Sequence, residues 1–372
     1  MAYRPAAEHA PEAPGERPGS RVDAVDLERE LSAIRTRVAD PTAGLYGPGS
    51  QLWEVNREAV IFLGGARAAL LQLAHPYVAE AIDQHSSTRR DPLGRFQRTF
   101  RSVFGMVYGD LESAFTAARR VHGVHTRIRG RLSEALGTRS DGTPYLANDP
   151  QALLWVHATL WDTSVLLFEK VVRALTVEEK DRYYRETRLF AKLFGIPDSL
   201  LPASWADFER YNRDMWRSAE LEVGRAAREI GAFLFEPQHP TLTPAMWWLR
   251  QMTAALMPQP LGRAFGLPYG RAQGATYALS IRALRWTRPL WPRRLRFVPP
   301  YLAALRRIAK TPGRDRTGEL MARLWLGPAE NRPITAAGGS PDGSAPPRAP
   351  APHAASSPGT AGRDAGAAGL GS

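Results

Sequence analysis

Residues 91–115, DPLGRFQRTFRSVFGMVYGDLESAF, decide the fold of this chain. The Asp-Pro pair that opens the stretch is a helix start, with proline at the first helical position. Gly109 can close this helix and Asp110 can cap the next one, so two successive helices are predicted. On the first helix, GRFQRTF (residues 94–100) places two arginines and a threonine among large apolar residues, on a face expected to be buried.

Helix-capping residues recur along the rest of the chain. Ser50 and Asp149 each precede apolar residues at helical spacing, and Thr176 with Glu179 has the pattern of a capping box. Strand-like alternation is scarce and no internal repeat is present. We therefore predict an all-α protein with one helical domain over residues 23–326. The expected helices span about 51–63, 66–74, 92–108, 111–136, 151–175, 177–195, 204–234, 243–257, 271–286, 299–310 and 315–326.

The two ends of the chain have a different composition. Residues 1–22 and 327–372 are rich in Pro, Gly, Ala and Ser, so a disordered leader and a disordered tail are predicted. The leader has no apolar h-region, hence no signal peptide is predicted and a cytoplasmic location is expected. The longest apolar runs are interrupted by His, Arg, Asp or Pro, which favours core helices over transmembrane helices.

The composition excludes several classes of site. The chain has 372 residues, 44% of them hydrophobic, which allows a large buried core. Because it contains no Cys, it has no disulfide, no Cys-ligated zinc, no iron–sulfur cluster and no thiolate nucleophile. His and carboxylate groups are left as metal ligands. The net charge of +12 comes almost entirely from Arg, which is weak evidence for nucleic acid as a partner.

Basic residues are concentrated in residues 271–326. This segment has thirteen Lys and Arg against two acids, Asp315 and Glu319, with several Trp and Phe residues among them. A solvated helical face is the first interpretation. Peripheral contact with a membrane or an anionic lipid is the alternative. Nucleic acid is not expected, because no recognition motif accompanies the charge.

Five of the eight histidines lie between residues 75 and 157, in the segments with the best helical pattern. Each one taken alone is best interpreted as a buried imidazole whose nitrogens are satisfied by nearby groups. No Glu-x-x-His, phosphate-binding loop or Gly-x-Ser-x-Gly elbow is present, so the motifs of di-iron proteins, nucleotide-binding proteins and hydrolases are missing. The five are His75, His85, His122, His125 and His157.

A haem iron is a familiar partner for a single imidazole in a helical protein without Cys. Arginines bind the haem propionates through charge-assisted hydrogen bonds. Arg95 and Thr99 are four residues apart and share a helix face, with Arg98 beside them. The alternative, in which Arg95 and Arg98 reach solvent or pair with Asp110 or Glu112, stays open at this point.

Four segments together resemble the DUF2236 family, the MpaB-type oxygenases, which includes the latex clearing proteins (rubber oxygenases). They are LLQLAHPYVAEAIDQHS, DPLGRFQRTFRSVFGMVYGD, AARRVHGVHTRIRG and YLANDPQALLWVHATLWD, in that order. The resemblance covers about residues 50–235, and more loosely the helical region to 326. It implies a helical, globin-like core that holds haem b as its cofactor and iron as its metal.

The resemblance also implies roles for particular residues. HTRIR matches the segment that carries the proximal ligand, which puts iron ligation on His125. RFQRT matches the distal motif, with Arg95 near a propionate or the pocket wall and Thr99 donating a hydrogen bond near oxygen. Arg98 stands where rubber oxygenases have a Lys that ligates iron in some closed forms. Since a guanidinium is a poor ligand, we expect an open distal face with added positive charge. His157 matches a family position that orients the pocket.

The resemblance implies an oxygenase for an apolar, isoprenoid or other lipid-like substrate, acting by oxidative cleavage of a carbon–carbon double bond. The acidic residue proposed as catalytic in rubber oxygenases has no secure match here; Glu80 and Asp83 lie nearest and neither is assigned. Rubber oxygenases are exported, whereas no signal peptide is predicted here, so a polymer outside the cell is not the expected substrate. The alternative is a non-catalytic haem-binding or membrane-associated helical protein of the same fold.

Overall fold

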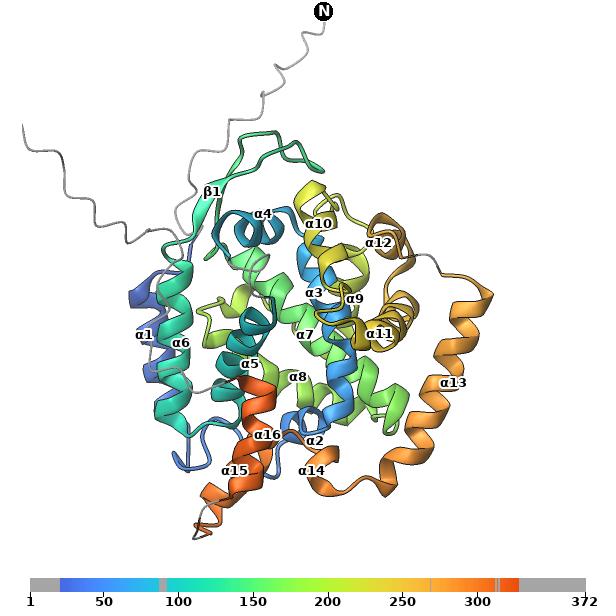
Figure 1. Cartoon of the computed structure of the whole chain (residues 1–372). Coiled ribbons are helices and arrows are strands. Elements are labelled where there is room, and N and C mark those ends of the chain that lie inside the picture. The colour runs from blue at the N-terminus through green and yellow to red at the C-terminus, as the bar shows by residue number, and fades with distance from the viewer. Residues whose placement is uncertain (1–20, 87–91, 268, 312, 314, 328–372) are drawn as a thin grey trace, which may run out of the picture. The chain divides into compact units, whose positions relative to one another are not determined.

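The computed structural model describes residues 21–86, 92–267, 269–311, 313 and 315–327, and for residues 92, 93, 95 and 96 it describes the backbone alone. All described residues belong to one structural unit. The described part contains sixteen α-helices and a two-stranded antiparallel sheet, which confirms the predicted all-α class (Figure 1). The elements are α1 (Ala24–Arg35), α2 (Gln51–Asn56), η1 (Ala59–Gly64), α3 (Gly65–Leu73), α4 (Pro76–His85), α5 (Pro92–Tyr108), α6 (Leu111–His125), β1 (Arg129–Arg131), β2 (Pro144–Leu146), α7 (Pro150–Val171), α8 (Val177–Lys192), η3 (Asp198–Leu200), α9 (Trp205–Met215), α10 (Arg225–Phe233), η4 (Pro240–Leu242), α11 (Thr243–Leu256), α12 (Gln259–Ala264), α13 (Arg271–Thr287), η5 (Arg288–Leu290), α14 (Arg293–Arg296), α15 (Pro299–Ile308) and α16 (Arg316–Leu326).

The described residues begin at residue 21 and end at residue 327, next to the predicted domain bounds of 23 and 326. Residues 1–20 and 328–372, which cover most of the predicted leader and tail, lie outside the described residues. Val22, which the prediction placed in the leader, is buried, and its amide donates a hydrogen bond to the Asn148 carbonyl at 3.2 Å. The globin-like arrangement of the core stays a prediction.

The predicted caps are confirmed. Ser50 caps α2 by accepting a hydrogen bond from the Trp53 amide at 3.2 Å. Asp149 caps α7 by accepting hydrogen bonds from two amides, each at 2.9 Å. Thr176 and Glu179 form both hydrogen bonds of a capping box at the start of α8. These side chains satisfy amides that have no partner within their own helix.

Helix α7 runs through the core (Figure 1). Its apolar residues continue around the helix, which is typical of a helix buried on most sides. It packs against α3, η1, α8 and α9. Trp155 is fully buried, and its indole donates a hydrogen bond to the Leu71 carbonyl of α3 at 2.7 Å. α7 therefore connects the N-terminal helices to the middle of the chain.

The helix predicted over residues 51–63 is interrupted at Arg57 and Glu58. The Arg57 carbonyl accepts a hydrogen bond from the Val298 amide at 2.8 Å, and Glu58 forms a β-bridge with Phe297. The Glu58 carboxylate also accepts hydrogen bonds from the buried guanidinium of Arg288, at 2.9 and 2.5 Å. Contacts with residues 297 and 298, far along the chain, thus replace the helical hydrogen bonds at this point. As a result, α2 is followed by the separate 3₁₀ helix η1.

The helix predicted over residues 111–136 is too long, because α6 ends at His125. Strand β1 follows and pairs with β2, with Gly130 opposite Tyr145. A Cβ at Gly130 would lie 2.4 Å from the Gln84 side-chain oxygen and 2.6 Å from the Tyr145 hydroxyl. Gly130 therefore permits a close contact between the strand and α4. Arg129, which the predicted helix included, lies on this strand.

The helix predicted over residues 204–234 is divided into α9 and α10. The connection between them is bonded to the loop that joins the two strands. Glu220 pairs with Arg139, and the Glu222 carboxylate accepts a hydrogen bond from the Gly137 amide. These tertiary contacts hold residues 216–224 outside a helix.

The C-terminal helices are fixed to the body at a buried ion pair. Arg288 and Glu58 have side chains that are 8% and 1% exposed. From this point α13 extends along one edge of the described part, and α15 and α16 pack on α5 (Figure 1). Near the end of α16, Trp325 contacts Phe62 edge-on with ring centroids 5.1 Å apart.

Among the described residues, no single helix has both the length and the hydropathy of a membrane span. One bent pair, Ala59–Leu73 with Pro76–His85, meets these criteria jointly by length and composition, with an angle of 100° between its halves.

Candidate functional site

Helices α5 and α6 form a hairpin, and four of the predicted site residues, Arg95, Arg98, Thr99 and His125, lie on it towards its open end. Gly109 makes the turn, since its amide donates a hydrogen bond to the Gly105 carbonyl at 3.0 Å. A Cβ on Gly109 would meet that carbonyl oxygen at 2.2 Å, so the turn requires glycine. The two helices pack along their length as they run away from the turn. The start of α5 is thereby brought to the same end of the hairpin as the end of α6 (Figure 1), and His125 is the last residue of α6.

His122 and His125 occupy the last turn of α6 and have different surroundings. The buried residues of this helix recur at spacings of three or four up to His122, and His125 continues the row. Burial lowers the pKa of His122, and its Nε2 has no hydrogen-bond partner among the described residues. The negative charges of Asp23 and Glu28 oppose this shift, which shows that His122 faces α1. His125 is half-buried at the end of the helix.

The residues of the RFQRT motif are covered to different extents. Arg98 is half-buried and Thr99 is exposed. The backbone of Arg95 is helical, and its side chain lies outside the described residues. One turn further on, Arg101 donates a hydrogen bond to the Leu326 carbonyl at the end of α16. The motif helix is therefore held by α16 close to the predicted site.

The two acids that were considered as partners for these arginines have other partners. Glu112 forms an ion pair with Arg35 at 2.5 Å, and this hydrogen bond lowers the pKa of the Glu112 carboxyl. Asp110 accepts a hydrogen bond from the Ser113 amide at 2.7 Å as the cap of α6, which lowers the pKa of Asp110. Each carboxylate thus has a stabilising partner outside α5.

A polar network that the sequence did not indicate connects α4 to the strands after α6. The Glu80 carboxylate is 1% exposed and accepts hydrogen bonds from the Ser133 hydroxyl and the Gln84 amide, both at 2.7 Å. The Gln84 oxygen accepts a hydrogen bond from the Tyr145 hydroxyl at 2.9 Å. Burial, with the negative charges of Glu80 and Asp83, raises the pKa of Tyr145 to about 12, so this hydroxyl stays protonated.

The same network holds the end of α4 against the strand that follows His125. The His85 Nε2 lies 3.0 Å from the Arg129 carbonyl, and the Gln84 amide donates to the Arg131 carbonyl at 2.9 Å. None of these contacts was visible in the sequence, because no helix was predicted over residues 76–85, where the structure has α4. Residues 129–133 were predicted to be helical, and residues 144–146 were not assigned to any element, so the strands were not expected.

His157 lies in the core at the contact of α7 with α8. It is 2% exposed, and its Nε2 lies 2.9 Å from the Thr187 carbonyl. Because a carbonyl only accepts, Nε2 carries the proton. The ring contacts Trp161 and Phe190 edge-on or tilted. Within the described residues, these contacts connect His157 to α7 and α8 and not to the hairpin that carries Arg98 and His125.

Burial lowers the pKa of His157 to about 4, and that of His75 to about 3 with help from the positive charge of Arg139. The unfolded chain binds a proton at each histidine below about pH 6.5, whereas the folded chain does not until the lower value is reached. Stability should therefore be highest above pH 6.5 and fall as the pH drops towards 4.

His157→Gln is expected to weaken this pH dependence, since it removes one of the titrating groups. The loss of unfolding free energy between pH 7 and pH 5 should shrink by about 2 kcal/mol relative to the wild type. Urea unfolding at the two pH values measures it. An unchanged loss would show that His157 does not titrate as a buried neutral imidazole.

A comparison with protein families matches residues 53–286 to the model described as "ER-bound oxygenase mpaB/B'/Rubber oxygenase, catalytic domain". The matched span includes α4, the α5–α6 hairpin and α7. Neither the curated proteins nor the solved structures contain a match to the chain. The match covers more than half of the chain and confirms the resemblance carried by the four motifs. The chain therefore belongs to the mpaB/rubber oxygenase catalytic-domain family of oxygenases.

Proposed function

We propose that this oxygenase depends on haem b and acts on an apolar substrate of isoprenoid or other lipid-like type, by oxidative cleavage of a carbon–carbon double bond with molecular oxygen. One observation carries the proposal: the HTRIR and RFQRT segments lie at the same end of the α5–α6 hairpin, within the residues matched to the family. Haem b would supply the redox chemistry, and the protein would control access and polarity.

The two helices of the hairpin would supply different functions, α6 the iron ligand and α5 the polar side chains of the pocket. His125 would hold the iron through its imidazole. Arg98 would place a fixed positive charge where negative charge develops, and Thr99 would donate a hydrogen bond from its hydroxyl. Arg95 would pair with a propionate or shape the pocket wall. His157 would act from a distance, by keeping α7 in place against α8.

The residues present suit a group that takes one axial side chain from the protein. Among the described residues, no three His, Asp or Glu side chains gather closely enough to hold a metal ion by themselves. A haem iron needs one imidazole. Towards the open end of the hairpin Arg98 and His125 are half-buried, whereas Phe104 and Phe115, nearer the turn, are buried.

The direct test is the absorption spectrum of the full chain purified after haem supplementation, followed by oxygen uptake with a polyisoprenoid such as squalene. A Soret band and alkene-dependent oxygen consumption are expected. A colourless protein with full helicity by circular dichroism would refute the haem proposal. A haem protein that consumes no oxygen with any alkene tested would favour the non-catalytic alternative.

Arg98→Lys is expected to shift the resting spectrum towards a six-coordinate iron. A lysine amine can lose its proton and donate a lone pair, whereas a guanidinium keeps its proton. Absorption and electron paramagnetic resonance spectra measure the change. Arg101→Lys is the matched control, because Arg101 lies on the same helix and donates to the Leu326 carbonyl. Identical spectra for wild type and Arg98→Lys would contradict a place for Arg98 beside the iron.

A further inference from the structure

Exposed apolar side chains gather on α13 and the segments beside it. Among the described residues, eleven large apolar side chains are exposed, and seven of them lie between residues 242 and 295. Single exposed apolar residues are ordinary on a protein surface, but a group of this kind marks an interaction site. The seven are Leu242, Trp247, Tyr269, Leu279, Trp286, Leu290 and Leu295.

Helix α13 is attached to the body along one side only. Tyr277 packs against the core, and the Trp248 indole of α11 donates a hydrogen bond to the Ser280 hydroxyl at 2.9 Å. No residue of α13 is fully buried. Leu279 and Trp286 are 69% and 80% exposed, and Leu290 in the following turn is 79% exposed. Their spacing, with Trp286 seven residues after Leu279, places them in one row along the helix.

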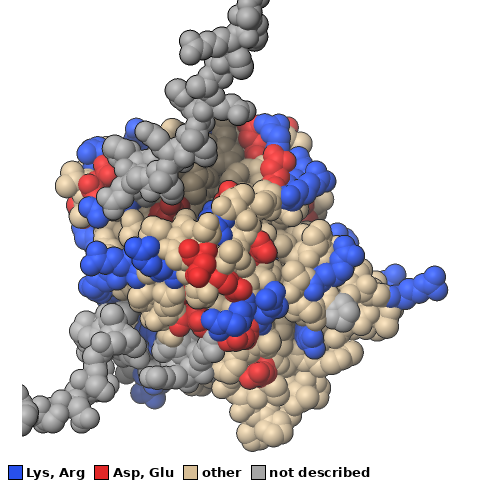
Figure 2. Space-filling view, turned by 90° about the horizontal axis from the view of Figure 1, so that it is seen from above, with Lys and Arg blue, Asp and Glu red and all other residues tan. Residues whose placement is uncertain are grey.

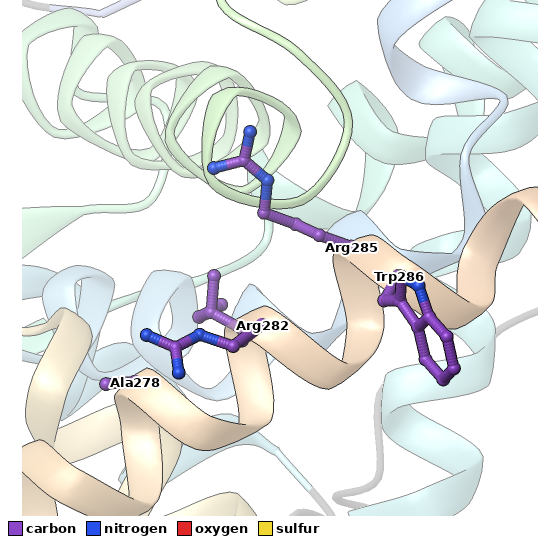
Figure 3. Close-up of a pocket in the computed structure, with 5 residues that line it drawn as sticks. Ala278, Arg282, Arg285 and Trp286 are labelled. Carbon is purple, nitrogen blue, oxygen red and sulfur yellow. The ribbon is translucent and has the colours of Figure 1, made fainter.

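Arginines lie in and beside the same row. Arg282 and Arg285, with Trp286 and two smaller residues of α13, line an open groove of about 500 Å³. Figure 3 shows the two guanidinium groups extending from the helix, with the Trp286 indole pointing in another direction. The right-hand part of Figure 2, where α13 lies, shows basic side chains among uncharged ones. We call Leu279, Arg282, Arg285, Trp286 and Leu290 the α13 face.

The stretch of sequence that contains α13 and its neighbouring segments has no acidic residue. Between Glu236 and Asp315 the sequence has no acidic residue, so α11 to α15 contain none. The buried carboxylate of Glu58, beyond the end of α13, is paired with Arg288, and the Arg296 guanidinium lies 3.6 Å from it. That ion pair fixes the end of α13 to the core and leaves the arginines of the α13 face for an outside anion.

We propose that the α13 face binds the interfacial region of a membrane that contains anionic lipid. Leucine side chains gain free energy only when they leave water for an apolar phase. Tryptophan is favoured at the level of lipid headgroups, because one end of its ring system is apolar and the other is polar. Arginines pair with lipid phosphates. A helix lying in the membrane plane would satisfy all three residue types together.

Two other occupants fit the α13 face less well. A second copy would meet the same surface around a two-fold axis, and arginines without acidic partners would then face each other. A nucleic acid would neutralise the arginines but would leave the side chains of Leu279, Trp286 and Leu290 in water. The membrane proposal rests on this surface alone and stands whether or not the protein binds haem.

Vesicle co-sedimentation of the full chain tests the proposal. Vesicles of phosphatidylcholine with phosphatidylglycerol should bind the protein, vesicles of phosphatidylcholine alone should bind it more weakly, and high salt should reduce the difference. Arg282→Gln/Arg285→Gln should weaken binding to the anionic vesicles roughly 30-fold, about fivefold for each arginine. Trp286→Ala/Leu290→Ala should weaken it about tenfold or more.

Two controls separate the α13 face from general effects. Arg37→Gln/Arg120→Gln removes the same charge from exposed positions near α1 and α6, on the opposite side in Figure 1. Val177→Ala removes apolar area from a side chain that is 69% exposed on α8. Neither should change vesicle binding more than twofold. All variants should keep wild-type circular dichroism, since the altered side chains are exposed.

Three results would overturn the proposal. The first is the absence of vesicle binding by the wild type. The second is equal weakening by the two arginine pairs, which would assign the attraction to the net charge of +12. The third is a concentration-dependent dimer that Trp286→Ala/Leu290→Ala abolishes while vesicle binding persists, which would assign the α13 face to contact between copies.

Discussion

His125→Ala is expected to give a folded protein that retains no haem b. In the proposed site, the His125 imidazole is the side chain that would bind the iron. Its loss should therefore abolish the Soret band after haem supplementation and bring alkene-dependent oxygen uptake below detection. The fold should survive, because His125 is half-buried at the last residue of α6 and makes no part of the central core. Absorbance per protein, together with far-ultraviolet circular dichroism, measures both effects.

His122→Ala is the matched control for this experiment. It removes the same side chain from the same helical turn, but His122 is 8% exposed and faces α1. Haem retention should therefore persist in His122→Ala, while stability falls by about 1–2 kcal/mol from the cavity. Added imidazole should restore part of the Soret band in His125→Ala. A full Soret band in His125→Ala with loss in His122→Ala would move the ligand to His122, and loss in neither would place it elsewhere.

Features of the fold that depend on a few neighbouring residues could be predicted from the sequence. Each cap, such as Ser50 on α2 or Asp110 on α6, bonds an amide three residues away, so its signal is complete within one turn. The turn at Gly109 is similarly local, since the close atom is the Gly105 carbonyl of its own helix. These signals were sufficient to predict the hairpin that carries Arg98 and His125.

Features that depend on distant partners could not be predicted in this way. The break at Glu58 is caused by Phe297 and Arg288, and the end of α6 is caused by strand pairing with residues 144–146. At both points the pattern of apolar and polar residues is compatible with a continuous helix, so the sequence shows no break. A short strand of three residues offers too few positions for its own period to show.

The candidate site follows the same division. Spacing placed Arg98 and Thr99 on one helix, and the family resemblance supplied the role that is proposed for His125. The burial of Glu80 between Ser133 and Gln84 required the strands to be in place, so the sequence left this acid unassigned. Nor did spacing distinguish His157, whose surroundings on α8 come from tertiary packing.

Arg67→Met is expected to lower the free energy of unfolding by about 3–5 kcal/mol. The Arg67 side chain is 3% exposed and joins three parts of the core. It pairs with Asp162 at 2.7 Å, donates to the Thr163 hydroxyl at 2.5 Å, and donates to the Leu256 carbonyl at 2.9 Å. Methionine has a similar volume but no donor, so the substitution leaves a charge and two acceptors without their partner. Urea unfolding followed by circular dichroism measures the loss.

A second substitution shows whether the buried charge causes this loss. In Arg67→Met/Asp162→Asn no charge is left unpaired, so about half of the lost stability should return, while the Leu256 carbonyl still lacks its donor. Arg29→Met is the surface control, because Arg29 pairs with Asp26 at 2.8 Å with both side chains well exposed, and it should cost less than about 1 kcal/mol. If the double variant were no more stable than Arg67→Met, the loss of stability would come from packing around Arg67. This packing includes the contact of the Arg67 guanidinium with the Trp216 ring, whose centroid lies 5.9 Å away. The ion pair with Asp162 would then contribute little to the contact between α3 and α7.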